Sequence, residues 1–228
     1  MMKRSMQPRI LSCALVLALA ACGGSGGGGD PLAQPTELVD GIATISSVRL
    51  GSALRTLPAE PLSTAEQASL TFMREEEKLA RDVYLYLASL WGASVPTFTN
   101  IASSEATHMA AVLTLLQRYG LPDPAAASGT GQFTDPKLQV LYDQLVARGS
   151  ASLVEALKVG AAIEEIDILD LQAALSFVDN RDIRLVYDSL LSGSRNHLQA
   201  FVRALQLQGV TYVPQYLAPA DYAAIVGS

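Results

Sequence analysis

The two histidines of this chain, His108 and His197, are the residues best suited to chemistry. Glu105 lies three residues before His108, a spacing that places both side chains on one face of a helix together with apolar residues. His197 likewise falls on the apolar face of a later helix. Burying a carboxylate or an imidazole among apolar side chains costs free energy unless a partner compensates for it. The pattern therefore indicates a buried site in which these side chains bind a common ligand.

Two other segments with helical periodicity each place a glutamate at their apolar stripe. Glu164 lies in the middle of the stripe from 153 to 178, and Glu76 and Glu77 flank the stripe of segment 64–91. Four helices that direct Glu, Glu-x-x-His, Glu and His into one interior resemble the iron and manganese sites of helix bundles. Several carboxylates are needed there because they neutralise and bridge one or two dications. We therefore expect iron or manganese, as one or two ions.

The pattern fixes the inward-facing glutamate in one of these two helices and leaves two alternatives in the other. Helical geometry does not choose between Glu76 and Glu77, whereas Glu75 is predicted to face solvent. Glu165 lies about 100° around the helix from Glu164 and is also predicted to face solvent. Glu164 is therefore the expected ligand of its segment.

One corner of the expected site lacks a carboxylate. A second Glu-x-x-His motif would require a glutamate three residues before His197, but that position is Ser194. The small Gly193 and Ser194 leave space that a water molecule, a substrate or Asp167 would fill; otherwise the second metal is weak or absent. Asp167 and Ser194 are thus candidates for a supporting role around the ligands.

The elements that must position these side chains are helices. A capping box, Ser63-Thr-Ala-Glu66, precedes the first long apolar-periodic run, and glycines and prolines separate the later ones. The sequence predicts an all-α fold of four long helices and a short one, followed by an extended tail with one helical turn. The expected helices span residues 64–91, 99–119, 136–148 (the short one), 152–178 and 181–208.

The chain divides into three parts. Residues 1–21 have a basic start and a short apolar run, which is typical of a secretory signal peptide and too short for a spanning helix. Residues 22–63 are expected to be a flexible Gly/Ser tether and an irregular arm, in which 41–50 forms a short strand or packs along the bundle. Residues 64–228 are expected to be the helical domain with its tail.

The end of the signal segment, Leu19-Ala-Ala-Cys22, resembles the lipobox of bacterial lipoproteins. That resemblance implies cleavage before Cys22, lipidation of this residue and a membrane anchor in the bacterial cell envelope. No aspartate follows Cys22, which is similar to an outer-membrane address and places the protein on the periplasmic face.

Composition excludes several other classes of protein. Of the two cysteines, Cys13 is expected to be removed with the signal peptide and Cys22 to be lipidated. The helical domain then has neither a disulfide nor a thiolate metal site. Loss of the signal's three basic residues changes the formal charge from −6 to −9. An acidic body argues against nucleic acid as a partner. The sequence does not fix the oligomeric state.

The first long segment carries a family resemblance. Glu77 is followed by Ala80 and Tyr84, which looks like the first-helix pattern of ferritins and rubrerythrins, where the leading glutamate is a metal ligand. The resemblance implies Glu77 as the ligand. Glu76 and Tyr84 then become candidates for supporting positions beside it.

Several separate motifs, which together cover about 70–216, resemble an uncharacterised prokaryotic family of ferritin-like proteins, catalogued as domain of unknown function 2202. The motifs are Arg74–Tyr84, Asn100–His108, Tyr119–Pro124, Ile163–Leu171 and Gly193–Leu198. The resemblance implies a ferritin-like four-helix bundle with an additional short helix, but no established reaction. The expected metal ligands are Glu77, Glu105, His108, Glu164 and His197.

Two functions from different classes follow. The first is an envelope-anchored metalloprotein with ferroxidase or peroxide- and oxygen-linked activity, a di-iron or di-manganese type oxidoreductase. The second is a non-catalytic lipoprotein, a scaffold or binding module with a vestigial site in which Glu–His and Glu–Arg pairs satisfy each other. Arg81 and Arg195 would be the arginine partners, although Arg195 is expected mainly to face outward.

Overall fold

A computed structural model of the chain describes residues 34–227, which are predominantly helical. Within this range a small two-stranded sheet precedes seven helices. All five predicted helices are present, and their ends differ from the predicted ones by at most three residues. The elements are β1 (Thr36–Val39), β2 (Ile42–Ile45), α1 (Ser47–Leu54), α2 (Thr64–Trp91), α3 (Thr97–Arg118), α4 (Pro136–Gly149), α5 (Leu153–Leu175), α6 (Arg181–Leu207) and α7 (Pro219–Val226).

Helix α2 begins at the predicted capping box. The Ser63 hydroxyl accepts the Glu66 backbone N–H at 3.2 Å, and Glu66 Oε2 accepts the Ser63 N–H at 2.9 Å. The other oxygen of Glu66 accepts the N–H of Asn180, the residue before α6. One carboxylate therefore caps α2 and ties it to the start of α6.

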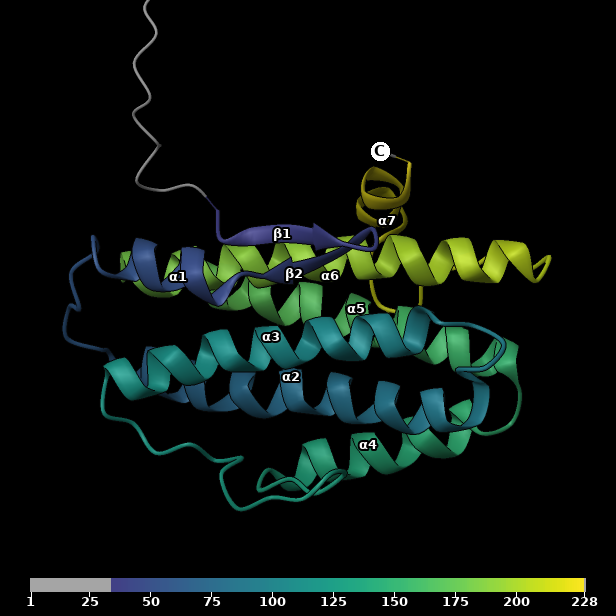
Figure 1. The fold of residues 1–228 in the computed structure, drawn as a ribbon, viewed down its shortest axis with the longest axis horizontal. Coiled ribbons are helices and arrows are strands. Elements are labelled where there is room, and N and C mark those ends of the chain that lie inside the picture. Colours follow the sequence, from purple (N-terminus) through teal and green to yellow (C-terminus); the bar gives the residue numbers. More distant parts are fainter. Residues whose placement is uncertain (1–33, 228) are drawn as a thin grey trace, which may run out of the picture. The chain divides into compact units, whose positions relative to one another are not determined.

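The four long helices pack against one another in a closed group. Helix α2 lies along α3 and α5 lies along α6, while further contacts join α3 to α6 and α2 to α5. Helix α4 lies against α2 and α5, and the β1–β2 hairpin contacts α3 and α6 on the opposite side (Figure 1). The interior between the four long helices is thus bounded by helices on every side.

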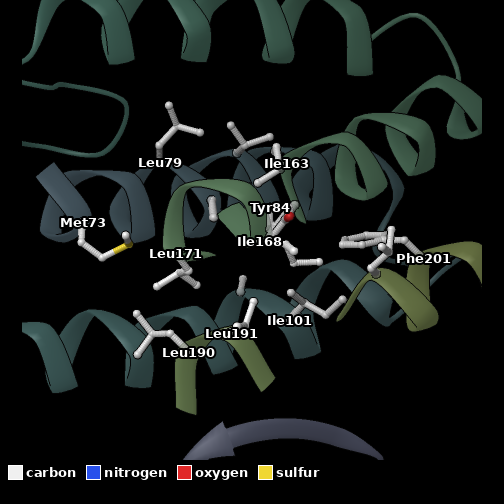
Figure 2. Packing of buried hydrophobic residues seen from close by; sticks show 14 of the residues in the cluster. Met73, Leu79, Tyr84, Ile101, Ile163, Ile168, Leu171, Leu190, Leu191 and Phe201 are labelled. Atoms are coloured by element: carbon white, nitrogen blue, oxygen red, sulfur yellow. The ribbon is translucent and has the colours of Figure 1, made fainter. Parts of the chain in front are cut away.

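The hydrophobic core fills much of this interior (Figure 2). Met73, Ile101 and Leu171 come from three different helices and are almost fully buried. Each such side chain stabilises the fold by about 1.5–3 kcal/mol. Gly160 of α5 faces Phe201 of α6 so closely that an added Cβ would lie 2.4 Å from the ring. A glycine is therefore required for these two helices to approach each other.

The segment expected to be an irregular arm contains a regular β-hairpin. Its two-residue turn is Asp40-Gly41, with φ of 51° and 78°, and Val39 pairs with Ile42 beside it. All residues of β2 are buried, because this strand lies against α3 and α6. The short strand expected within 41–50 is therefore present as β2, whereas β1 and helix α1 were not predicted.

Glu75 corrects one prediction, because it does not face solvent. Its side chain is buried, and its carboxylate accepts the Thr134 N–H and hydroxyl at 2.6 Å and the Asp135 N–H at 3.1 Å. The loop before α4 folds over this face of α2, and Lys78 holds the same loop through the carbonyls of Gly129 and Gln132. A helix position that looks external in isolation is thus covered by a loop.

Glu165 corrects a second prediction for the same reason. It is fully buried under the chain that follows α6, and it accepts the Tyr212 hydroxyl at 2.5 Å. It also accepts the backbone N–H groups of Gln215, Tyr216 and Leu217. The tail is therefore fixed to α5, and it ends in α7, which is longer than the single helical turn expected.

The expected signal peptide, the lipidation site Cys22 and the glycine run to 29 lie outside the described residues. Among the helices of residues 34–227, none combines the length and the apolar character needed to cross a membrane.

Candidate metal centre

Both histidines lie inside the group of four long helices. His108 on α3 and His197 on α6 are fully buried. Their rings stack, with centroids 5.3 Å apart and an angle of 21° between the planes. The fold therefore brings together two imidazoles that are 89 positions apart in the sequence.

Glu105 lies between the two rings and contacts each with a different oxygen. Its Oε2 is 2.9 Å from Nδ1 of His108, and its Oε1 is 2.8 Å from Nδ1 of His197. On the outer sides, Glu77 Oε2 is 3.3 Å from Nδ1 of His108, and Glu164 Oε2 is 3.5 Å from Nδ1 of His197. The result is two similar half-sites that share Glu105.

All five predicted ligands thus converge, one or two from each long helix. Glu105, His108 and His197 alone offer three ligand atoms within 4.8 Å of one another. Carboxylate oxygens and imidazole nitrogens are ligands of divalent metals, so these three residues form a candidate metal-binding triad.

Several buried polar atoms of the cluster have no hydrogen-bond partner among the described residues. They include Nδ1 of both histidines, Nε2 of His108 and Oε1 of Glu77. The Nδ1 atoms lie in ion pairs with Glu105, whereas Nε2 of His108 and Oε1 of Glu77 have neither kind of partner among the described residues. Leaving a buried polar atom unsatisfied costs about 1–3 kcal/mol. A cation among them would supply the missing partner, so the residues present fit a bound metal.

Attraction between opposite charges decides the direction of the pKa shifts of Glu105, His108 and His197. Burial alone would raise the pKa of Glu105, but His108 and His197 hold it well below its usual range. Burial opposes the charged form of His197, yet Glu105 and Glu164 raise its pKa to about 10. His108 also has a raised pKa, because Glu105 and Glu77 outweigh its burial. Without a metal, the neighbouring Glu105 carboxylate therefore favours the protonated form of both imidazoles.

The outer carboxylates behave in the opposite way. Burial, followed by repulsion from Asp167, raises the pKa of Glu77 well above its usual range. Burial and repulsion from Glu164 raise the pKa of Asp167 to about 7. Glu164 also has a raised pKa, chiefly because of burial. Crowded carboxyl groups of this kind favour a nearby positive charge.

Tyr84 of α2 supports Glu164 directly. Its hydroxyl donates a hydrogen bond of 2.5 Å to Glu164 Oε1 and also lies 3.3 Å from the Gly160 carbonyl. Burial and the charge of Glu164 raise the pKa of Tyr84, so the phenol keeps its proton. This leaves Glu164 Oε2 as the oxygen nearer His197.

The sequence predicted open space at Gly193 and Ser194, the corner that lacks a glutamate, but the structure shows none at Gly193. Gly193 does not leave free space, because an added Cβ would lie 2.6 Å from Cε1 and Nε2 of His108. Ser194 donates a hydrogen bond to Asp167 Oδ2, while Asp167 Oδ1 has no hydrogen-bond partner. Asp167 is the residue that occupies this corner.

The structure also separates Glu77 from Glu76. Glu77 contacts His108, whereas Glu76 is buried near Asp167 and Asp170, and repulsion from both adds to burial in raising its pKa. Glu76 Oε2 has no hydrogen-bond partner. Glu76 therefore lies at the edge of the cluster rather than between the histidines.

Comparison with known proteins places the chain in a family. Residues 66–228 match the family described as "Uncharacterized protein domain (DUF2202)". The chain belongs to the DUF2202 family. An uncharacterised protein of Methanocaldococcus jannaschii is 49% identical over 175 residues, which cover 77% of this chain and 94% of the relative.

A solved structure agrees with the assignment. The crystal structure of a hypothetical protein from Methanococcus jannaschii DSM 2661 is similar with a TM-score of 0.73 and 50% identity, over 75% of this chain and 97% of that one. Both descriptions lack a function, so membership of the DUF2202 family brings no activity to this chain.

One contact near the site of this DUF2202 domain was not predicted, and the two arginines expected beside the site have other surroundings. The carbonyl of Ala43 in β2 lies 3.0 Å from Nε2 of His197, a contact that no side-chain pattern could indicate. Arg81, expected as a partner for a core glutamate, instead donates to Asp82, and Arg195 is exposed as predicted.

Proposed function

We propose that this chain is a ferritin-like metalloprotein whose four long helices form a four-helix bundle that holds one or two iron or manganese ions. The observation that carries the proposal is the pair of buried Nδ1 atoms of His108 and His197. Each lies within 3 Å of a different oxygen of Glu105 and forms an ion pair with it when the ring is protonated. Such atoms have the position and the free lone pair of metal ligands once their protons leave.

The two half-sites suggest two positions for metal. Glu77 and His108 would hold one ion, Glu164 and His197 would hold the other, and Glu105 would lie between them. Bound iron or manganese supplies Lewis acidity and electron transfer to peroxide or oxygen. The residues of the chain exclude water, compensate the charge and, through Tyr84, orient Glu164. Ferroxidase or peroxide-linked oxidoreductase activity is the reaction class that we propose, by analogy with the fold.

The proposal includes a location. The lipobox-like sequence ending in Cys22 would anchor the mature protein in the cell envelope, on the periplasmic face of an outer membrane. The glycine-rich sequence after Cys22 would then act as its tether.

The alternative is a non-catalytic scaffold or binding module with a vestigial site. Its support is the charge pairing of Glu105 with His108 and His197, which compensates part of the burial without any metal. In that case the polar cluster serves only the fold.

The metal content of protein purified without chelators distinguishes the two. The matched variants are Glu77→Gln and Glu75→Gln, since both positions are buried on α2 but only Glu77 contacts a histidine. Stoichiometric iron or manganese that Glu77→Gln reduces and Glu75→Gln retains supports the proposal. Protein that stays free of metal after exposure to both ions contradicts it and favours the vestigial site.

A further inference from the structure

Both backbone polar groups of Ala43 in β2 contact the helices that carry the histidines. Its N–H donates to Asn196 Oδ1 at 2.9 Å, and its carbonyl accepts the Ser104 hydroxyl at 2.5 Å. The same carbonyl lies 3.0 Å from His197 Nε2. Ser104 directly precedes Glu105 on α3, and Asn196 directly precedes His197 on α6. One backbone unit of the hairpin is therefore attached to the neighbours of two candidate ligands.

The contact with His197 has a chemical consequence. Nε2 of His197 also lies 3.0 Å from the Ser104 hydroxyl, whose proton is donated to the same Ala43 carbonyl. Both neighbours therefore present an oxygen that accepts, so His197 Nε2 carries a proton. In the neutral ring, Nδ1 then bears the lone pair, and Nδ1 is the atom that faces Glu105 and Glu164. Metal-binding histidines commonly have their other nitrogen fixed in this way, which sets the orientation and basicity of the ring.

The hairpin is also fastened to α3 at a second point. Thr107 Oγ1 accepts the Ile45 N–H at 2.9 Å and lies 2.8 Å from Thr44 Oγ1. Thr107 holds the hairpin through Thr44 and Ile45, whereas the His197 ring lies against Ala43. Residues 36–45 precede the 66–228 range that matches the DUF2202 family. The hairpin thus lies outside the matched range and contacts the helices that carry both histidines.

We infer that the β1–β2 hairpin orients a ligand of the metal centre, with Ala43 as the positioning residue. Its carbonyl keeps the proton of His197 on Nε2 and directs Nδ1 to the metal. This inference rests on the proposed metal site. Because linkage is reciprocal, a hairpin that strengthens metal binding is itself stabilised by the metal, by the same factor.

The test compares variants that loosen the hairpin at the two attachment points in the full chain. Asn196→Leu removes the acceptor for the Ala43 N–H, and Asn196→Asp retains an acceptor there. Thr107→Val is the matched control, because it removes contacts to β2 without involving Ala43. Affinities for Zn²⁺ and Mn²⁺ are measured by competition with a chelator. Asn196→Leu is expected to weaken binding by about tenfold, as for other residues that orient a metal-binding histidine, and Asn196→Asp to restore it.

Two further measurements separate positioning from general stability. In the protein loaded with diamagnetic Zn²⁺, the Nε2 proton of His197 should exchange slowly with water in the parent and in Thr107→Val, but rapidly in Asn196→Leu. In the parent, Zn²⁺ should slow amide hydrogen exchange of residues 36–45 more than that of α7, which also packs on α6. The second measurement needs no variant, so it holds even if Asn196→Leu fails to fold.

The outcomes separate the inference from the proposed function. Tight metal binding by the parent, with equal affinity in Asn196→Leu and no slowing of hairpin exchange, would overturn the role of the hairpin and leave the metal centre standing. An equal loss of affinity in Thr107→Val would also overturn the specific role of Ala43. A parent protein that binds neither ion would overturn both.

Discussion

The Ser194 hydroxyl donates a hydrogen bond to the carboxylate of Asp167, and this contact joins α6 to α5 inside the polar cluster. A symmetric di-metal site would have a glutamate at position 194. Here that position holds a serine, whose hydroxyl donates to a carboxylate of α5. Asp167 is buried, and its Oδ1 atom remains without a hydrogen-bond partner. That oxygen is available as a ligand.

The first prediction is that Asp167 completes the second metal position. Asp167→Asn keeps the size of the side chain and its ability to accept the Ser194 hydrogen bond, but removes the charge. Titration with Mn²⁺ should show two equivalents for the parent and the loss or strong weakening of about one in this variant, since carboxylates are the preferred ligands of such ions.

Asp170→Asn is the control for Asp167→Asn, because Asp170 lies one turn further along α5 and is not fully buried. It should retain both equivalents. A parent that binds two equivalents and an Asp167→Asn variant that also binds both would show that Asp167 only supports Ser194.

The second prediction concerns the adjacent pair Glu164 and Glu165, which are both buried but serve different ends. Glu164→Gln should reduce metal content, since its Oε2 faces His197. Glu165→Gln should retain the metal but weaken the attachment of the tail, at a cost of about 1–3 kcal/mol for its buried hydrogen bonds. Metal analysis and limited proteolysis after residue 209 measure the two effects. Loss of metal in Glu165→Gln alone would contradict the assignment.

The sequence predicted the long helices well because their signals are local. The capping box at Ser63 and Glu66 and the apolar stripes of α2 and α5 need no knowledge of the rest of the fold. The convergence of Glu105, His108 and His197 followed from the same periodicity, since a polar residue within an apolar stripe must point inward.

The wrong predictions share one physical cause. Glu75 and Glu165 each lie away from the main stripe of their helix, but a loop and the tail cover them and donate backbone N–H groups. Whether an external helical position is covered depends on contacts between distant segments, which periodicity does not report. The Ala43 carbonyl escaped notice because every residue has such a group, and only the fold places this one beside His197.

The third prediction concerns location and follows from the sequence alone. Cys22→Ser removes the thiol that lipidation requires, so the variant should leave the membrane fraction and appear in the soluble envelope fraction. Cell fractionation with an antibody to the protein measures this, and Ser25→Ala in the same tether is the control. A variant that stays as membrane-bound as the parent would exclude the lipid anchor.

The fourth prediction is that the metal-free protein loses stability as the pH rises from about 6.5 to 10. The pKa of His197 is about 10 in the folded protein against 6.5 for an unperturbed imidazole, so folding favours its protonated form. This contribution is fully present below about pH 6.5 and disappears as the pH passes 10. Asp167, whose pKa is raised from 3.8 to about 7, shifts stability in the same direction at lower pH, because its folded state also favours the proton.

Metal binding has the opposite pH dependence and strengthens as the pH rises, because a bound ion requires His108 and His197 to lose the Nδ1 proton. Urea unfolding of metal-free protein at pH 6.5, 8 and 9.5 should therefore show a falling free energy of unfolding, and Mn²⁺ affinity should rise over the same range. His197→Gln removes one of the two imidazoles with a raised pKa and should reduce the decline without metal. An identical response of the metal-free parent and His197→Gln to pH would show that folding does not favour the protonated form of His197. The charge pairing of His197 with Glu105 and Glu164, which supports the vestigial alternative, would then be contradicted.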